Sequence, residues 1–173
     1  MKPQMILSLL IFITGFYPWM LPAKEPDNSS ALFQIGRSRD ANEIHYVASL
    51  DCEGNLVAEN PVDIYWIRHT EGGRREPLTW VQNKYAYGIK YLEISSQKAV
   101  FQFVSYPSRT FSIQKSDQGR YNVYTSFENR KFALTRIFVQ IENGSFWFPQ
   151  ITRVELSGID EQTRQYIVES IEL

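Results

Sequence analysis

Apolar and polar residues alternate along most of the chain after residue 30. The apolar positions are rich in β-branched and aromatic residues, and turn-forming residues interrupt the alternation about every 8–14 positions, which is typical of short β-strands. The pattern predicts about ten strands, at residues 32–37, 43–50, 62–68, 87–94, 99–105, 110–115, 120–127, 131–141, 145–156 and 165–171.

Turn-forming residues connect these strands in a way that favours hairpins. Asn143-Gly144 lies between two strand-like runs, and both residue types tolerate the positive φ that a type I′ turn requires. We therefore expect the stretch 87–157 to be a meander of antiparallel hairpins. The last strand carries Glu169 and Glu172, and such charges suit an exposed sheet edge.

One face of the predicted strands is mostly apolar, as Ile44, Tyr46 and Ala48 illustrate. This is the pattern of an antiparallel sheet with one covered face. The fold class is therefore mainly β, an antiparallel meander that forms either a calycin-like barrel or a sandwich. One short helix is predicted at 77–86, with Pro77 at its first position. We expect it to cover the strand 99–105, which is apolar on both faces.

The N-terminal residues have the pattern of a signal peptide. Lys2 precedes an apolar run from Met5 to Phe16, and Leu21-Pro22-Ala23 ends in a small residue before a polar stretch. A transmembrane anchor would need about 20 uninterrupted apolar residues, whereas Pro18 divides this run. We therefore expect export, either to the periplasm of a Gram-negative bacterium or out of the cell.

The domain organisation follows from the same boundary. Residues 1–23 form the expected signal peptide, 24–31 a polar linker and 32–173 a single β-rich domain. No second long apolar run appears downstream, so we expect that the chain does not span the membrane after cleavage.

Composition and charge exclude several classes of protein. The 173 residues are 43% hydrophobic and 21% charged, which is not the composition of a disordered chain. The net charge of −1 and a pI near 6.1 argue against a nucleic-acid-binding surface. A single cysteine, Cys52, allows no internal disulfide, so stability must come from packing.

Sequence patterns for catalysis and metal binding are missing. His45 and His69 lie far apart, without the spacing of a zinc site, and Cys52 lies between two acidic residues that disfavour a reactive thiolate. The chain also lacks a Gly-x-Ser-x-Gly nucleophile motif. We therefore expect no catalytic residue, no metal and no cofactor, and enzymatic activity is a minority hypothesis.

A group of polar residues is the most promising candidate for a site. Arg37 shares a strand face with Phe33 and Ile35, so its guanidinium should lie at the edge of the core, where it needs a partner. We expect Glu76 to be that partner and the pair to lock the helix against the sheet, with Arg37→Met and Glu76→Gln strongly coupled. The alternative is the floor of a pocket for a polar ligand. The candidate ligand-binding residues are Arg37, Asn42, Tyr65, Trp66, Glu76, Gln82 and Tyr87.

Three stretches carry a family resemblance. They are residues 32–42, 61–66 and 72–88, and they include Arg37-Ser38, Gly72-Gly73 and Tyr87-Gly88. In order and spacing the chain resembles the exported bacterial family called domain of unknown function 4833, from about residue 31 to the end. The resemblance implies an exported, β-rich single domain without established catalytic residues. Asp40 stands where the family pattern has Asn, which changes the local charge.

Three functional hypotheses follow. The first is a non-enzymatic β-domain that binds a small apolar or carbohydrate-like ligand or an envelope component, because Tyr and Trp side chains are plentiful and can line a cavity. The second is a periplasmic protein-interaction or structural module that uses an exposed strand edge or Arg74-Arg75. The third is a hydrolase whose site draws on Arg37, His45 and Glu76.

Overall fold

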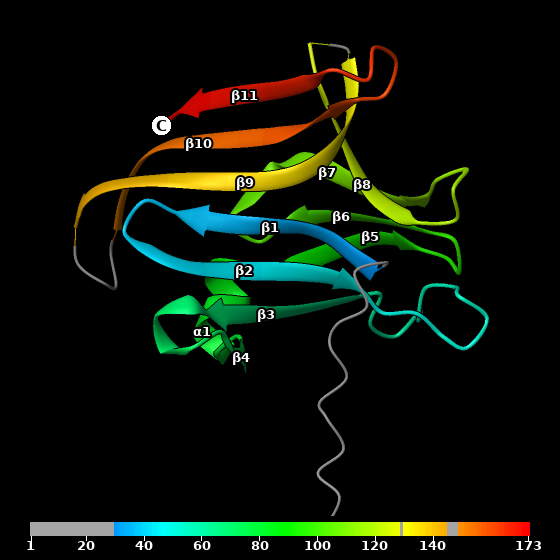
Figure 1. The fold of residues 1–173 in the computed structure, drawn as a ribbon, viewed down its shortest axis with the longest axis horizontal. Coiled ribbons are helices and arrows are strands. Elements are labelled where there is room, and N and C mark those ends of the chain that lie inside the picture. Colours follow the sequence, from blue (N-terminus) through cyan, green and yellow to red (C-terminus); the bar gives the residue numbers. More distant parts are fainter. Residues whose placement is uncertain (1–29, 129, 145–148) are drawn as a thin grey trace, which may run out of the picture.

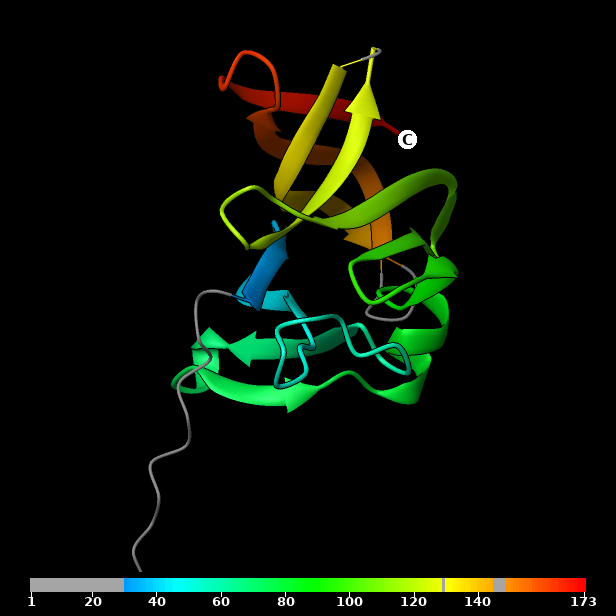
Figure 2. The ribbon, with the colours of Figure 1, turned by 90° about the vertical axis from the view of Figure 1, so that its right-hand side faces the viewer.

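The computed structural model describes residues 30–128, 130–144 and 149–173. This part of the chain is mainly β, as expected, with 11 strands in one sheet that curls into a half-barrel (Figures 1 and 2). The elements are β1 (Ala31–Arg37), β2 (Asp40–Ala48), β3 (Val62–Arg68), η2 (His69–Glu71), β4 (Arg74–Pro77), α1 (Trp80–Tyr85), β5 (Ile89–Ile94), β6 (Lys98–Phe103), β7 (Tyr106–Lys115), β8 (Tyr121–Phe127), β9 (Arg130–Gly144), β10 (Pro149–Asp160) and β11 (Tyr166–Glu172).

The long strand β9 organises the sheet. Along one edge β9 pairs with β10, from Phe132 to Gly144. Its other edge pairs first with β8 and then, in parallel, with β1, whose Gln34 and Arg37 lie opposite Arg136 and Val139. Two wings therefore leave the same edge of β9: one consists of β1, β2, β3 and β4, and the other of β8, β7, β6 and β5.

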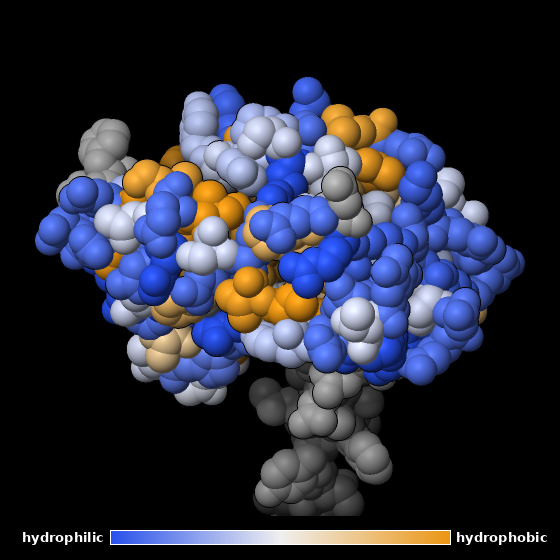
Figure 3. All heavy atoms as spheres, turned by 90° about the horizontal axis from the view of Figure 1, so that it is seen from above, coloured by the Kyte–Doolittle hydropathy of each residue, from blue (hydrophilic) through white to orange (hydrophobic). Residues whose placement is uncertain are grey.

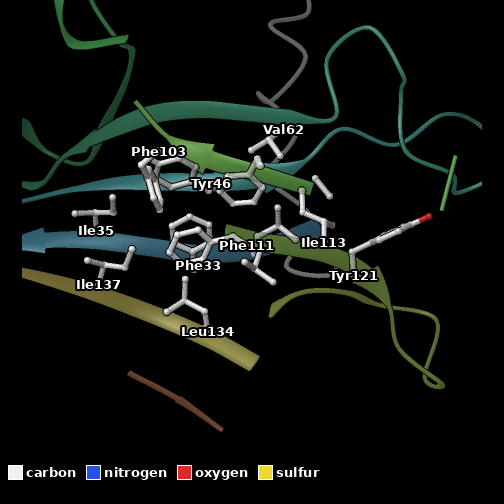
Figure 4. Close-up of a cluster of buried hydrophobic side chains, with 14 of the residues drawn as sticks. Phe33, Ile35, Tyr46, Val62, Phe103, Phe111, Ile113, Tyr121, Leu134 and Ile137 are labelled. Atoms are coloured by element: carbon white, nitrogen blue, oxygen red, sulfur yellow. The ribbon is translucent and has the colours of Figure 1, made fainter. Parts of the chain in front are cut away.

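The inner faces of the two wings pack against each other and form the core (Figure 4). Phe33 of β1 stacks on Tyr46 of β2 at 4.3 Å between ring centroids. Phe103 of β6 meets both rings edge-on, at 6.0 and 5.8 Å, and so joins the wings. Such aromatic pairs contribute about 0.5–1.5 kcal/mol beyond the apolar area they bury. The alternation seen in the sequence thus becomes one shared apolar interior.

The sheet is intermediate between the barrel and the sandwich that the sequence left open. The strands belong to one continuous sheet, as in a barrel, yet β4 and β5 are the two ends of its strand order and are not paired with each other. The curvature comes from the wings that diverge from β9 rather than from a closed ring of strands.

The predicted turn at Asn143-Gly144 is wrong. Both residues belong to β9 and lie opposite Gln150 and Pro149 in the ladder with β10. The hairpin strands are longer than the local turn signal indicated, because continued pairing satisfies more backbone groups than an early turn would. The connection, and the first residues of the predicted strand 145–156, lie outside the described residues.

The predicted helix at 77–86 is shorter, because Thr79 caps it. The Thr79 side chain accepts a hydrogen bond from the Gln82 backbone N–H, and Gln82 Oε1 accepts one from the Thr79 backbone N–H, so α1 begins at Trp80. Pro77 instead ends β4 opposite Tyr65. No α1 residue is buried, so the predicted cover over strand 99–105 is also wrong: α1 lies at one end of the half-barrel (Figure 1).

The predicted signal peptide, 1–23, and most of the predicted linker, 24–31, lie outside the described residues. Among the residues that are described, no helix has the length and apolarity needed to cross a bilayer.

Strands β9 and β10 approach each other closely at Gly158, and a substitution there tests this packing. A Cβ at this position would lie 2.2 Å from the Ala133 carbonyl oxygen and 2.6 Å from the Phe132 ring. We predict that Gly158→Ala lowers the free energy of unfolding by about 2–4 kcal/mol, because backbone must move to admit the methyl group. Urea unfolding followed by circular dichroism measures the change.

Gly36→Ala is the matched control, since this glycine also lies in a buried strand. Its added Cβ would come closest to the flexible end of the Arg136 side chain, at 3.0 Å, and would make an ordinary contact with the Phe138 ring at 3.6 Å. A change below about 1 kcal/mol is expected there, and equal effects of the two substitutions would contradict the proposed crowding.

Candidate ligand-binding cavity

A cavity of about 870 Å³ lies on the inner side of the half-barrel, at the end where α1 is found. Its walls are mostly apolar and come from both wings and from the hairpin of β10 and β11; they include Ile35, Phe103, Phe111, Val139, Val154 and Ile171. These residues line a cavity because the sheet is only half closed: their strands diverge toward this end. The volume lies within the range of about 300–1,000 Å³ that is usual for small-molecule sites.

A polar group marks one end of the cavity. The Arg37 guanidinium donates a hydrogen bond to the Tyr87 hydroxyl at 3.3 Å and forms an ion pair with Asp40 across the turn between β1 and β2. Gln82 also lines this end. This end therefore offers both hydrogen-bond donors and acceptors, whereas most of the other lining residues are apolar.

Trp66 contacts the residues of this polar end from the protein interior. Its indole is almost completely buried, and the guanidinium of Arg37 lies over the ring at 4.6 Å from the centroid. Its Nε1–H donates to Gln82 Oε1 at 3.3 Å, and the Tyr87 ring packs against it edge-on at 5.7 Å. Trp66 thus holds three cavity residues from β1, from α1 and from the segment that follows α1.

The expected pair of Arg37 and Glu76 is wrong. Glu76 lies opposite Trp66 on β4 and accepts a hydrogen bond from Arg68 Nε at 2.8 Å. The Arg68 guanidinium also lies over Trp66, at 4.8 Å. Arg37 therefore pairs with Asp40 and Glu76 with Arg68, and in the described structure the two arginines are linked only through the indole that both contact.

The seven predicted ligand-binding residues separate into two groups. Arg37, Gln82 and Tyr87 line the cavity, and Trp66 lies directly behind them. The other three residues, Asn42, Tyr65 and Glu76, do not line it.

Asn42 and Tyr65 have contacts that explain their burial without a ligand. The Asn42 side-chain oxygen accepts hydrogen bonds from the Thr70 backbone N–H and hydroxyl, at 3.3 and 3.1 Å, which positions η2. Tyr65 projects from the opposite face of the sheet, where it stacks on His45 at 5.9 Å and lies under the Arg75 guanidinium at 3.6 Å.

The structure does not assemble the hydrolase site considered from the sequence. His45 lies on the outer face of β2, whereas Arg37 faces the cavity. The Nε2 atoms of His45 and His69 lie 3.5 and 3.4 Å from Glu43. Burial lowers the pKa of His45, and Glu43 partly opposes that shift. In the described part of the chain, no group of three or more His, Cys, Asp or Glu side chains could hold a metal ion.

A buried ion pair next to the cavity was missed by the sequence analysis. Arg109 of β7 and Glu169 of β11 form two hydrogen bonds of 2.5 Å, and the Glu169 side chain is only 4% exposed. These hydrogen bonds raise the pKa of Arg109. The two strands are not neighbours in the sheet, so the pair ties the β10–β11 hairpin to the opposite wing.

The sequence did contain a signal for this pair. Glu169 alternates with Ile167 and Ile171, whose side chains are partly buried against the core, and this register places it on the inner face. The interpretation of Glu169 as an edge charge was wrong, because the half-barrel folds this face of β11 over β7.

Fold and site together define a class: an all-β half-barrel domain with an apolar cavity that ends in a polar group. The chain belongs to the family described as Domain of unknown function (DUF4833), whose model matches residues 33–170. The resemblance found in the sequence is thereby confirmed. No curated protein and no solved structure matches the chain.

The observed contacts couple Arg37 to Asp40 and not to Glu76, the partner expected from the sequence. We predict that Arg37→Met costs about 1–3 kcal/mol of unfolding free energy through its lost ion pair and ring contact, and Glu76→Gln less than about 1 kcal/mol, since that pair is partly exposed. The two effects should add within about 0.5 kcal/mol. Arg37→Met and Asp40→Asn should instead be non-additive. Thermal unfolding of single and double variants measures both couplings, and a strong coupling between Arg37 and Glu76 would contradict the contacts described.

We predict that breaking the Arg109–Glu169 pair lowers the free energy of unfolding strongly. Glu169→Gln removes the charge that balances a mostly buried guanidinium, and we expect a loss of about 3–5 kcal/mol. The double variant Arg109→Met with Glu169→Leu should lose much less, because no unpaired charge is left inside. Chemical unfolding of the three variants tests this.

Glu71→Gln is the control for the ion pair, since its partner Arg74 lies in an exposed pair. It should change stability by less than about 1 kcal/mol. If Glu169→Gln behaved in the same way, the hairpin would not depend on the buried pair.

Proposed function

We propose that the protein binds a small amphipathic ligand, with an apolar chain inside the half-barrel and a polar group next to Arg37. The observation that carries the proposal is the cavity of about 870 Å³, whose lining is mostly apolar and includes the polar group of Arg37, Tyr87 and Gln82 around Trp66. A purely apolar ligand would leave this end unused. A strongly polar ligand would lose its hydration against the apolar walls.

The apolar walls supply the affinity. Each CH₂ group that moves from water into such a site contributes about 0.8 kcal/mol, so an acyl chain of ordinary length is bound without any charged contact.

The polar end sets the head group. The Arg37 side chain lines the cavity and is 19% exposed, so its guanidinium is the donor that a ligand can meet there. A guanidinium forms its strongest hydrogen bonds with carboxylate and other anionic oxygens. This favours a fatty acid or a related acyl compound over a sugar.

Export is part of the proposal. Residues 1–23 have the pattern of a signal peptide, and acyl compounds are components of the bacterial envelope that an exported carrier would meet. N-terminal sequencing of the protein from a periplasmic fraction tests this part separately: a chain that still begins at Met1 would overturn it.

A second candidate function rests on the edge of β11. Within the described residues β11 pairs only with β10, and it exposes the side chains of Tyr166 and Val168. The upper face of the molecule shows apolar patches among hydrophilic residues (Figure 3). An exposed edge strand of this kind supports the interaction-module hypothesis, in which a partner adds a strand.

A fluorescent fatty acid, cis-parinaric acid, tests the proposed function. We predict saturable binding that palmitate displaces. Val154→Trp, which fills the cavity, should weaken binding at least tenfold, whereas Val168→Trp on the outer face of β11 should leave it unchanged. Val139→Phe gives a second, smaller filling in case Val154→Trp disturbs folding, which circular dichroism detects. Non-saturable binding, or equal affinity of the inner and outer variants, would show that the cavity is not the site.

A further inference from the structure

The outer surface of α1 is unusually apolar for an exposed helix. Trp80, Tyr85 and Val81 are 67%, 60% and 44% exposed, although none of them has a core to join. The rings of Trp80 and Tyr85 lie edge to face at 6.0 Å, and Lys84 Nζ lies 4.6 and 5.2 Å from their centroids. Together these four residues form an aromatic-basic patch. Such a patch on a single-domain protein indicates an interaction site.

The charge around this patch is positive although the chain as a whole is slightly acidic. Residues 77–92 contain Lys84 and Lys90 and no acidic residue, whereas the whole chain has a net charge of −1. Arg39 lines the cavity on the neighbouring turn between β1 and β2. The patch is therefore complementary to an anionic surface.

The patch lies at the mouth of the cavity. Val81 and Tyr85 belong both to the patch and to the cavity lining. Ile151 and Leu173, which are also exposed, line the cavity but lie outside the patch. Figure 1 shows α1, the turn between β1 and β2 and the end of β11 at the same end of the half-barrel. A surface that covered the patch would also face the opening.

We infer that the aromatic-basic patch docks on an anionic phospholipid bilayer. Trp and Tyr side chains favour the interface between head groups and acyl chains, because one part of each ring system is apolar and the other makes hydrogen bonds. Lysine beside them is attracted by anionic head groups. A folded protein partner would need a flat or grooved complement to a six-residue helix, whereas a bilayer accepts the side chains individually.

The charges on the β10–β11 side of the cavity opening determine how the protein is oriented on the bilayer. Glu142 and Glu172 are exposed on the outer face of that side, since they alternate with the cavity-lining Ile141 and Leu173, and Arg153 lies opposite Glu172 in the ladder. Anionic head groups repel these carboxylates, so α1 approaches the bilayer and the β10–β11 side tilts away. The opening then faces the lipid interface, which gives an acyl ligand a path that avoids bulk water.

Vesicle sedimentation tests the inference with two lipid compositions. The protein should sediment with vesicles of phosphatidylcholine that contain phosphatidylglycerol, and at least tenfold less with phosphatidylcholine alone. Lys84→Gln should weaken binding roughly fivefold, the factor expected for one basic residue near an anionic surface, and Trp80→Ala by at least as much.

Two exposed residues far from the patch provide matched controls. Tyr166→Ala removes an aromatic ring of similar exposure from β11, and Lys115→Gln removes a charge from the C-terminal end of β7, whereas Tyr106 at the other end of that strand lines the cavity. Both should bind vesicles like the unaltered protein. All variants share the same N-terminal segment, so any contribution of residues 1–29 is common to them.

The outcomes separate this inference from the proposed function. Val154→Trp should keep vesicle binding while it loses the fatty acid, and Trp80→Ala should keep the fatty acid in solution while it loses the vesicles. Equal loss in patch and control variants would overturn the inference, as would equal binding to both lipid compositions. Concentration-dependent dimerisation that Trp80→Ala abolishes in sedimentation velocity would assign the patch to a second copy of the chain instead.

Discussion

The structure depends on the way β9 shares its edges. One edge is occupied by β10, and the other must accommodate both β8 and β1, one after the other along the strand. Because each wing continues in its own direction from that edge, the inner faces of the wings turn toward each other. Phe33 and Tyr46 from one wing then meet Phe103 from the other. A single sheet thus encloses a core without forming a closed barrel.

The same constraint leaves the cavity. Where the wings are close, aromatic rings fill the space between them (Figure 4). At the end with α1, side chains of β9, such as Val139, line the cavity instead. Two polar contacts tie other elements to the wings: Arg109 with Glu169 between β7 and β11, and Trp66 with Gln82 between β3 and α1.

The cavity and its mouth suggest a division of roles. In the proposed function, the apolar walls provide affinity with little selectivity, since they discriminate only by the volume and length of an acyl chain. Selectivity in this proposal comes from the polar end, where Trp66 contacts both Arg37 and Tyr87. The patch on α1 adjoins the cavity, because Val81 and Tyr85 belong to both, but no α1 residue is buried in the core.

The sequence by itself determined the strands, the apolar face and the family, because two-residue periodicity is local and one buried face is enough to produce it. It also selected Arg37, Gln82 and Tyr87, and the cavity contains all three. Only the tertiary structure decided which carboxylate each arginine meets: Asp40 rather than Glu76 for Arg37, and Glu169 for Arg109. Partners of that kind depend on how strands far apart in sequence are placed across the interior. The placement follows from β9 pairing with three other strands, which no local pattern of residues encodes.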